Sequence, residues 1–264
     1  ANEENGSTNI TDCRTINEPG RYTLENDIES DQDVCLHITA NRVTFDGQGH
    51  TISSPDDFRD DSVGILVTGN RVEVRDVTVR RWGTGIQFQE NAASAIVDCT
   101  VENSPAAGIR FIDATRNLVE DTCSYGESSG ISLNASHRNT LRDSEFTAET
   151  AGVRLDKSDR NVFTQNDVDG TDLGVIGESS ERNVFAQNIV PGQDIGFLLF
   201  GGSDFNHLSE NTVTSPSDIG IIIGNSDRNE LSGNVITDGD NEGVLLTASD
   251  RNRLTENIIR RNRV

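Results

Sequence analysis

The chain has 264 residues, of which 33% are hydrophobic and 5% aromatic, so its core must be built from Ile, Val, Leu and Ala. It carries 44 Asp and Glu against 22 Lys and Arg, a formal net charge of −22 at pH 7. This charge excludes a nucleic-acid binder that works by neutralising phosphates, and it disfavours contact with an anionic membrane. No apolar run reaches the roughly 18 residues of a membrane span, so no direct membrane insertion is expected. The acids are dispersed, as expected of a surface adapted to concentrated salt.

The first dozen residues are polar, and residues 1–12 are predicted to form a flexible, glycosylated tail. Asn5 and Asn9 each begin an N-glycosylation sequon there, and Asn134 begins a third. The chain starts with alanine in place of methionine, which suggests a processed terminus. Residues 13–33 are then expected to form an N-terminal cap segment.

Internal periodicity dominates the remaining chain, residues 34–264. A glycine followed by a short apolar alternation returns every 21 to 24 residues, at Gly64, Gly85, Gly108, Gly130, Gly152, Gly174, Gly196, Gly220 and Gly243. Asparagines return with the same period, at Asn117, Asn139, Asn161, Asn183, Asn206, Asn229 and Asn252. A third column comprises Thr100, Thr122, Ser144, Asn166, Asn188, Asn211, Asn234 and Asn257. Each repeat holds short segments of period two rich in Ile, Val, Phe and Thr, which favours strands over helices.

A repeat of about 22 residues cannot bury its apolar face alone, so the repeats must stack on one another. A leucine-rich horseshoe needs a leucine-dense consensus, which these repeats lack. A parallel β-helix explains the asparagine columns, because amides at one corner of every coil can hydrogen-bond along the stack. The sequence therefore predicts an all-β solenoid, a single-stranded parallel β-helix of about ten coils of 21–24 residues.

In these repeats, and in the segments from Pro19 to Ile28 and from Val43 to Ile52, the chain resembles the right-handed parallel β-helix repeat family. This pectate-lyase-like superfamily includes secreted and cell-surface proteins of salt-loving archaea. The resemblance implies a right-handed coil, but the family is functionally mixed and does not fix an activity. The last coil has no capping helix, so we expect that the chain continues beyond Val264 or that another subunit covers the end.

The four cysteines form two pairs, 22 and 24 residues apart, close to the length of one coil. We expect disulfides Cys13–Cys35 and Cys99–Cys123 between adjacent coils, with four free buried thiols as the alternative. Disulfides and sequons together predict an extracellular or cell-surface protein. The four histidines show no ligand spacing with the cysteines, so no metal site is predicted.

The resemblance to polysaccharide lyases and hydrolases implies a search for calcium-binding carboxylates, a basic residue or paired aspartates on the outer face of a strand ladder. The best constellation comprises Arg110, Arg154, Asp113 and Asp156. Its arginines lie two coils apart, about 10 Å, and no family motif is matched residue by residue. A non-catalytic protein is favoured, with calcium expected only if the chain is a lyase. Copper handling, known for one branch of the family, is disfavoured because the chain has no methionine and its histidines are scattered.

The turn Ser158-Asp159-Arg160-Asn161 recurs in similar form at residues 180–183, 226–229 and 249–252. Repetition of this kind can mark a binding site. We interpret it as structural, with columns of acids and arginines compensating one another through exposed ion pairs while the asparagine satisfies the corner.

Outward positions in the second half of the repeats hold large apolar side chains, at Ile176, Leu198, Ile222 and Leu245, with Phe200 beside them. Either a return loop covers this stripe, or the stripe is a contact surface for another subunit or protein. The leading hypothesis is a salt-adapted structural protein of the cell surface that self-assembles or docks on other surface proteins. The alternative is a polysaccharide-binding module, or a lyase or hydrolase, acting on acidic glycans.

Overall fold

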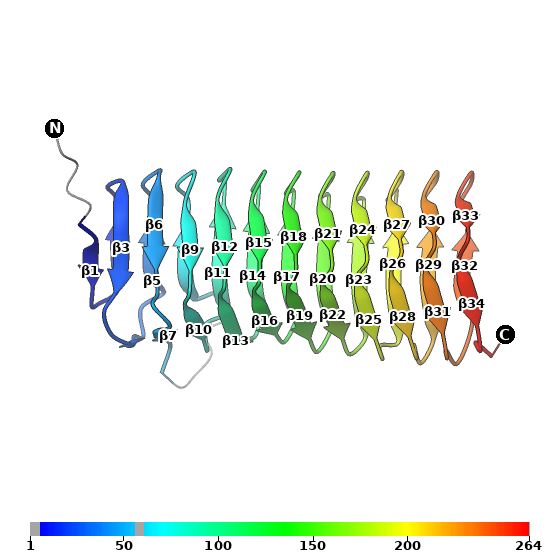
Figure 1. Cartoon of the computed structure of the whole chain (residues 1–264), viewed down its shortest axis with the longest axis horizontal. Helices are drawn as coiled ribbons and strands as arrows, with labels where there is room; N and C mark the ends of the chain where they lie inside the picture. Colours follow the sequence, from blue (N-terminus) through cyan, green and yellow to red (C-terminus); the bar gives the residue numbers. More distant parts are fainter. Residues whose placement is uncertain (1–5, 56–60, 264) are drawn as a thin grey trace.

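The computed structural model describes residues 6–55 and 61–263, which form one right-handed parallel β-helix, as predicted. The coils stack along the long axis in chain order, so the two termini lie at opposite ends of the rod (Figure 1). The strands form three parallel sheets, which we call A, B and C. Each coil adds one strand first to sheet B, then to sheet A and then to sheet C. The described residues contain no helix that is long and apolar enough to cross a membrane.

In the described part of the chain, sheets A, B and C have twelve, eleven and eleven strands. Sheet A comprises β1 (Thr8–Ile10), β3 (Gly20–Leu24), β6 (Val43–Asp46), β9 (Glu73–Arg75), β12 (Ala95–Val97), β15 (Leu118–Glu120), β18 (Thr140–Arg142), β21 (Val162–Thr164), β24 (Val184–Ala186), β27 (His207–Ser209), β30 (Glu230–Ser232) and β33 (Arg253–Thr255). Sheet B comprises β2 (Arg14–Ile16), β5 (Val34–Ile38), β8 (Val63–Val67), β11 (Thr84–Gln89), β14 (Ala107–Ile112), β17 (Ser129–Asn134), β20 (Ala151–Asp156), β23 (Leu173–Glu178), β26 (Ile195–Phe200), β29 (Ile219–Gly224) and β32 (Val244–Thr247). Sheet C comprises β4 (Ile28–Glu29), β7 (Thr51–Ser53), β10 (Thr78–Arg80), β13 (Thr100–Ser104), β16 (Cys123–Gly126), β19 (Glu145–Ala148), β22 (Asp167–Gly170), β25 (Ile189–Pro191), β28 (Thr212–Thr214), β31 (Val235–Thr237) and β34 (Ile258–Arg260).

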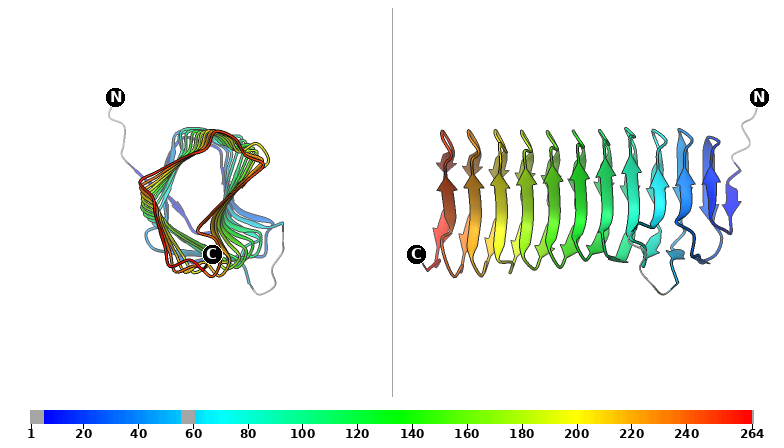
Figure 2. Two further views of the ribbon diagram at one scale, coloured as in Figure 1. Left: turned by 90° about the vertical axis from the view of Figure 1, so that its right-hand side faces the viewer. Right: turned by 180° about the vertical axis from the view of Figure 1, so that it is seen from behind.

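The core runs through the centre of the coils, and the view along the axis shows the coils superposed around it (Figure 2). Like residues stack on like residues, because the register places equivalent positions of successive coils side by side. The rings of Phe88 and Phe111 stack with centroids 5.1 Å apart, and those of Phe163 and Phe185 with centroids 4.9 Å apart. The core is therefore built from repeated aliphatic side chains together with a few Phe rings, some of which stack on one another.

Two buried asparagine ladders hold the corners, as predicted. At the corner between sheets B and A, Asn161 donates its backbone N–H to Oδ1 of Asn183 at 2.8 Å, and its Nδ2 donates to the Ser136 carbonyl at 2.9 Å. At the corner between sheets A and C, the N–H of Asn188 donates to Oδ1 of Asn211 at 3.0 Å. Each amide thus satisfies backbone groups that the turn leaves without strand partners.

The β-helix begins earlier than predicted. Strand β1 lies inside the predicted flexible tail, but it pairs with β3. Its last residue, Ile10, is fully buried in the core, which holds the strand in place. The predicted cap segment contains β2 to β4, which already contribute to all three sheets. These first coils lack the asparagine and glycine columns, so periodicity alone did not reveal them.

Candidate functional site

The predicted catalytic arginines lie on the outer face of sheet B, as strand alternation requires. Arg110, Ser132 and Arg154 are register partners on β14, β17 and β20, so the two arginines lie two coils apart. Within the described residues neither guanidinium has an ion pair. The arginines are therefore available to a ligand, at positions about 10 Å apart with Ser132 between them.

The predicted catalytic aspartates do not join these arginines. Asp113 lies on the turn after β14, in the left-handed conformation with φ of 50°. Asp156 is the register partner of Asn134 and Glu178, and its Oδ1 lies 3.8 Å from Nζ of Lys157. Among the described residues, no hydrogen bond or ion pair joins either aspartate to Arg110 or Arg154.

The apolar stripe is in register along β23, β26, β29 and β32, as predicted. Ile176 is 9% exposed, and Leu198, Ile222, Leu245 and Phe200 are half-buried. In both side views the connections between these coils stay at the corners of the rod (Figures 1 and 2). The stripe is therefore an apolar column on the outer face of sheet B, buried at Ile176 and half-buried from Leu198 onward.

One of the two predicted disulfides forms. Cys13 and Cys35 are bonded, with Cα atoms 4.5 Å apart. Cys99 and Cys123 are free, which corrects the second prediction. Thr100, not Cys99, is the register partner of Cys123, and a one-residue offset turns the two side chains to opposite faces of sheet C.

The two free thiols consequently lie in different surroundings. Cys99, and not Thr100 as predicted, occupies the ladder column at the A–C corner, with Sγ 3.3 Å from the Val97 carbonyl. Burial raises the pKa of the Cys99 thiol to about 12. Burial, aided by the Glu145 carboxylate, also raises the pKa of the Cys123 thiol. Neither cysteine has the lowered pKa of a reactive thiol.

The three sequons have different structural settings. Asn5 lies outside the described residues. Asn9 is an exposed residue of β1 whose side chain hydrogen-bonds Glu25. Asn134 ends β17 and is exposed, but Ser136 of the same sequon is fully buried and donates to the Asn134 carbonyl at 2.8 Å. Ser136 therefore has a structural reason to be present, and glycosylation of Asn5, Asn9 and Asn134 stays a prediction.

The turn from sheet B to sheet A carries an arginine at eight of ten successive coils. All eight are exposed and have φ between 56° and 60°, and the residues are Arg42, Arg71, Arg116, Arg138, Arg160, Arg182, Arg228 and Arg251. Ala93 and Phe205 occupy the two remaining coils. The N–H of each donates to the carbonyl just before the next, which keeps the column in register. We call these eight side chains the arginine ridge, and at ~4.8 Å a coil they extend over about 40 Å.

The predicted compensation of this column by neighbouring acids is wrong at most coils. In the part of the chain that the structure describes, Arg182 alone among the ridge arginines has an ion pair, from Nη1 to Oε2 of Glu181 at 2.6 Å. The acids instead accept backbone N–H groups of the next coil. Oδ1 of Asp159 accepts from Glu181 at 2.8 Å, and Oδ1 of Asp204 accepts from Asp227 at 2.6 Å. Within the described residues, seven of the eight ridge guanidinium groups are therefore left without an ion pair.

The corner between sheets A and C shows that this backbone does not require arginine. Its left-handed residues have φ between 48° and 65° and also precede a ladder residue, but they are Asp76, Asp98, Asp121, Asp143, Gln165, Gln187, Glu210, Gly233 and Glu256. We call this column the acidic edge. Left-handed conformation by itself favours Gly, Asn and Asp. The arginines at the other corner are therefore not explained by the conformation of the turn.

Phe205 interrupts the ridge between two arginines and stacks with both. The guanidinium carbons of Arg182 and Arg228 lie 4.8 and 5.2 Å from the centroid of its ring. Cation–π contacts of this kind hold the two guanidinium groups over the ring. The ridge is thus partly ordered at this coil.

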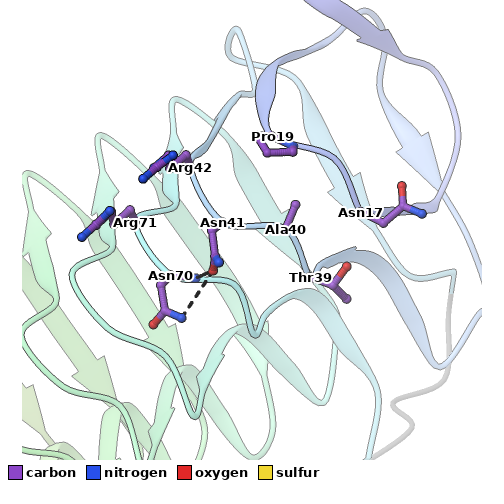
Figure 3. A pocket seen from close by; sticks show the side chains of 8 residues that line it. All are labelled: Asn17, Pro19, Thr39, Ala40, Asn41, Arg42, Asn70 and Arg71. Carbon is purple, nitrogen blue, oxygen red and sulfur yellow. Dashed lines mark hydrogen bonds between the residues drawn. The ribbon is translucent and has the colours of Figure 1, made fainter.

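Two hollows lie along the N-terminal part of the ridge. The first, of about 410 Å³, is lined by Arg42, Arg71, Asn41 and Asn70, and the two arginine side chains extend side by side next to it (Figure 3). The second, of about 420 Å³, lies between Arg71 and Arg116, where Ala93 replaces the arginine. Arg71 lines both hollows.

The sequence contained a signal for the ridge. Arginine precedes the ladder asparagine at the same 22- or 23-residue step as the asparagine itself, in Arg116, Arg138, Arg160, Arg182, Arg228 and Arg251. The neighbouring acids made charge compensation the simpler interpretation. Their capping of the backbone became visible only in the structure.

Solved structures with similar folds come from several kinds of protein. A variant of the periplasmic alginate epimerase AlgG aligns with a TM-score of 0.71 at 13% identity, over 93% of this chain and 76% of that one. The DFA-IIIase of Arthrobacter chlorophenolicus A6 aligns with a TM-score of 0.65 at 13% identity, over 87% and 69%. The Dettilon tailspike protein aligns with a TM-score of 0.62 at 15% identity, over 92% and 61%. At these identities the likeness shows the fold alone. No curated protein matches the chain.

A family described as periplasmic copper-binding protein (NosD) matches residues 8–190 and 128–264. Copper sites are built chiefly from His, Cys and Met. The sequence has no Met and four His, and the described residues contain no group of three or more His, Cys, Asp or Glu that could hold a metal ion. The residues present therefore do not fit a copper centre. The matched segments together span nearly the whole chain, which belongs to the NosD family.

Proposed function

We propose that this protein is an extracytoplasmic polysaccharide-binding solenoid that holds a single chain of an acidic polysaccharide along the arginine ridge. The observation that carries this proposal is the in-register column of eight exposed arginines, seven of them without an ion pair among the described residues, on a molecule of net charge −22. The Cys13–Cys35 disulfide supports a location outside the reducing cytosol.

The energetics of the ridge support a binding role. Like charges that face each other across adjacent strands are destabilising. Arginines scattered among 44 acidic residues would instead be attracted to their surroundings. A column of them at ~4.8 Å spacing is thus unfavourable in the free protein. An anionic chain along the ridge would reverse the sign of this interaction.

The shape and charge of the ridge favour a thin, linear polyanion. The ridge follows one corner of the rod, and acids cover much of the remaining surface, so a wide polyanion would meet repulsion on both sides. Guanidinium groups bind carboxylates through two parallel hydrogen bonds. Uronic acid chains present carboxylates in single file. Fold relatives that include an alginate epimerase are consistent with a carbohydrate ligand.

The test is binding of polygalacturonate and alginate to the wild type and to the triple variant Arg116→Gln, Arg138→Gln, Arg160→Gln. Three exposed charged contacts are expected to change the dissociation constant by roughly 10- to 100-fold. The matched control replaces Asp98, Asp121 and Asp143 of the acidic edge by Asn and should not weaken binding. Equal affinity of wild type and ridge variant would sink the proposal, as would tighter binding of single-stranded DNA than of either polysaccharide.

Self-association through the apolar stripe is a second candidate function. Among the described residues, one outward-facing column of sheet B has four large apolar residues in successive coils, namely Ile176, Leu198, Ile222 and Leu245. Two copies of a strongly anionic protein would repel least where both surfaces lack charge. Leu198→Glu should then shift a concentration-dependent oligomer to monomer in light scattering at high salt. A wild type that stays monomeric at every concentration would remove this candidate.

A further inference from the structure

We propose that the two hollows on either side of Arg71 hold consecutive sugar residues of the acidic chain, so that the N-terminal end of the ridge is its selective end. This inference rests on the proposed function of the ridge and adds where along it the sugars are recognised. The remaining arginines would then bind the rest of the chain by charge alone.

The first hollow exists because the turns at this corner lengthen along the chain. The turn can be counted from the last inward residue of sheet B to the corner position that Gly20, Val43, Val72 and Ser94 share in register. It then has residues 17–19 in the first coil, 39–42 in the second, 68–71 in the third and 89–93 in the fourth. A shorter turn extends less far from the axis of the rod than the longer turns of the coils that follow it. The corner is therefore recessed where Arg42 and Arg71 stand (Figure 3).

The lining of the first hollow suits a sugar acid. Its polar groups are neutral amides and a hydroxyl, from Asn17, Asn41, Asn70 and Thr39, and no carboxylate lines it. Asn41 Oδ1 accepts the backbone N–H of Asn70 at 2.7 Å, which fixes the amide and leaves its NH₂ group to donate. The two guanidinium groups would bind the carboxylate, and the amides would bind hydroxyl groups.

The second hollow exists because Ala93 has a small side chain at a ridge position. Its φ of 57° matches that of the ridge arginines, so the turn is unchanged and only the side chain is missing. Arg71 and Arg116 stand on either side of the gap, with Leu118 supplying an apolar wall. The single carboxylate in its lining, that of Glu73, lies 3.6 Å from Nη1 of Arg75 and is already paired.

The neighbours of the ridge also distinguish its two ends. The residues just before Arg42, Arg71, Ala93 and Arg116 are neutral, namely Asn41, Asn70, Ala92 and Thr115. From Arg160 onward the corresponding residues are acids, namely Asp159, Glu181, Asp204, Asp227 and Asp250. An anionic ligand meets less repulsion at the N-terminal end, where the hollows are.

Substitutions at Ala93 separate shape from charge. Ala93→Arg adds a positive charge in a conformation that the ridge already gives to arginine, but it fills the second hollow. We expect it to weaken binding of a galacturonate trimer about 10-fold while binding of polygalacturonate is retained or strengthened. Ala93→Gln, which fills the hollow without adding charge, should weaken the trimer similarly. Thr255→Arg adds the same charge far from the hollows and should change trimer affinity less than twofold.

Calorimetric titration of both ligands gives outcomes that distinguish the two proposals. If polygalacturonate binds the ridge but the trimer does not bind, or binds Ala93→Arg more tightly than wild type, the selective-end inference is overturned and the ridge proposal stands. If Arg71→Gln leaves trimer affinity unchanged, the inference is likewise overturned. If neither the polymer nor the trimer binds the wild type, both proposals fall.

Discussion

Two corners of this solenoid share one backbone and carry opposite charge. At each corner a residue with positive φ precedes a buried ladder asparagine, and the ladder bonds have the same lengths within a few tenths of an ångström. At the B–A corner the left-handed residue is arginine in eight of ten coils, and at the A–C corner it is mostly Asp, Gln or Glu. The buried ladder residue is therefore what holds the corner, and the exposed residue before it is free to serve another purpose.

The difference teaches where to look for function in a repeat protein. A column that repeats because the turn needs it should look alike at equivalent turns, as the asparagines do. A column that repeats at one corner only, against the charge of the molecule, needs an explanation outside the fold. The arginine ridge is such a column.

The largest expected effect tests whether the two corners are structurally equivalent. Asn161→Ala and Asn188→Ala each remove a buried amide that accepts one backbone N–H and donates to one carbonyl. Each should lower the free energy of unfolding by about 3 kcal/mol, because buried backbone groups are left unsatisfied. Chemical denaturation of the two variants measures this. A loss at one corner only would break the comparison.

A smaller effect should separate stability from binding at the ridge. Arg160→Asn places a residue that tolerates positive φ in a left-handed turn and removes like-charge repulsion, so stability should rise by about 0.5 to 1 kcal/mol. Affinity for polygalacturonate should fall in the same variant. Gln165→Asn, at the acidic edge with φ of 56°, controls for the backbone contribution and should leave affinity unchanged. A ridge variant that loses stability would contradict the account.

Salt should sharpen the comparison further. Raising the ionic strength from 0.1 to 1 M shortens the Debye length from about 10 Å to about 3 Å. The stabilisation by Arg160→Asn should then shrink towards the value for Gln165→Asn, and polysaccharide affinity of the wild type should fall. Thermal unfolding and titration at several salt concentrations measure both. A stability difference that is independent of salt would show that repulsion along the ridge is not its cause.

The smallest expected effect concerns a carboxylate on sheet C, beyond the acidic edge. Burial, together with the nearby Glu145 and Asp169 carboxylates, raises the pKa of Asp167. A raised carboxyl pKa makes the ionised form unfavourable in the folded state, so the penalty is present above the folded pKa and disappears below the unfolded value. Asp167→Asn should therefore stabilise the protein slightly at neutral pH. Melting temperatures that show the same gain at pH 3 would contradict this assignment.

The fold was predictable because each coil repeats the same requirements. The glycine and asparagine columns give the period, and Asn166 or Asn188 can satisfy a corner only if the coils stack in register. The start of the solenoid was not predictable from these columns, since β1 to β4 contain neither. There, burial of Ile10 and the Cys13–Cys35 bond hold the first coils instead.

The candidate site was less predictable because it depends on details smaller than one coil. A one-residue offset places Cys99 inside and Cys123 outside, although their separation in sequence is close to a full coil. The pairing of Asp159 with a backbone N–H, and not with Arg160, depends on the direction of one side chain. The hollows depend on a one-residue difference in turn length and on Ala93.

The most direct test of the central claim is arginine footprinting on the wild-type protein. Phenylglyoxal modification is followed by mass spectrometry with and without saturating polygalacturonate. The account predicts protection of the ridge, strongest at Arg71 and Arg116, while Arg110 and Arg154 on sheet B stay reactive. Protection of Arg110 and Arg154 with an unprotected ridge would contradict it.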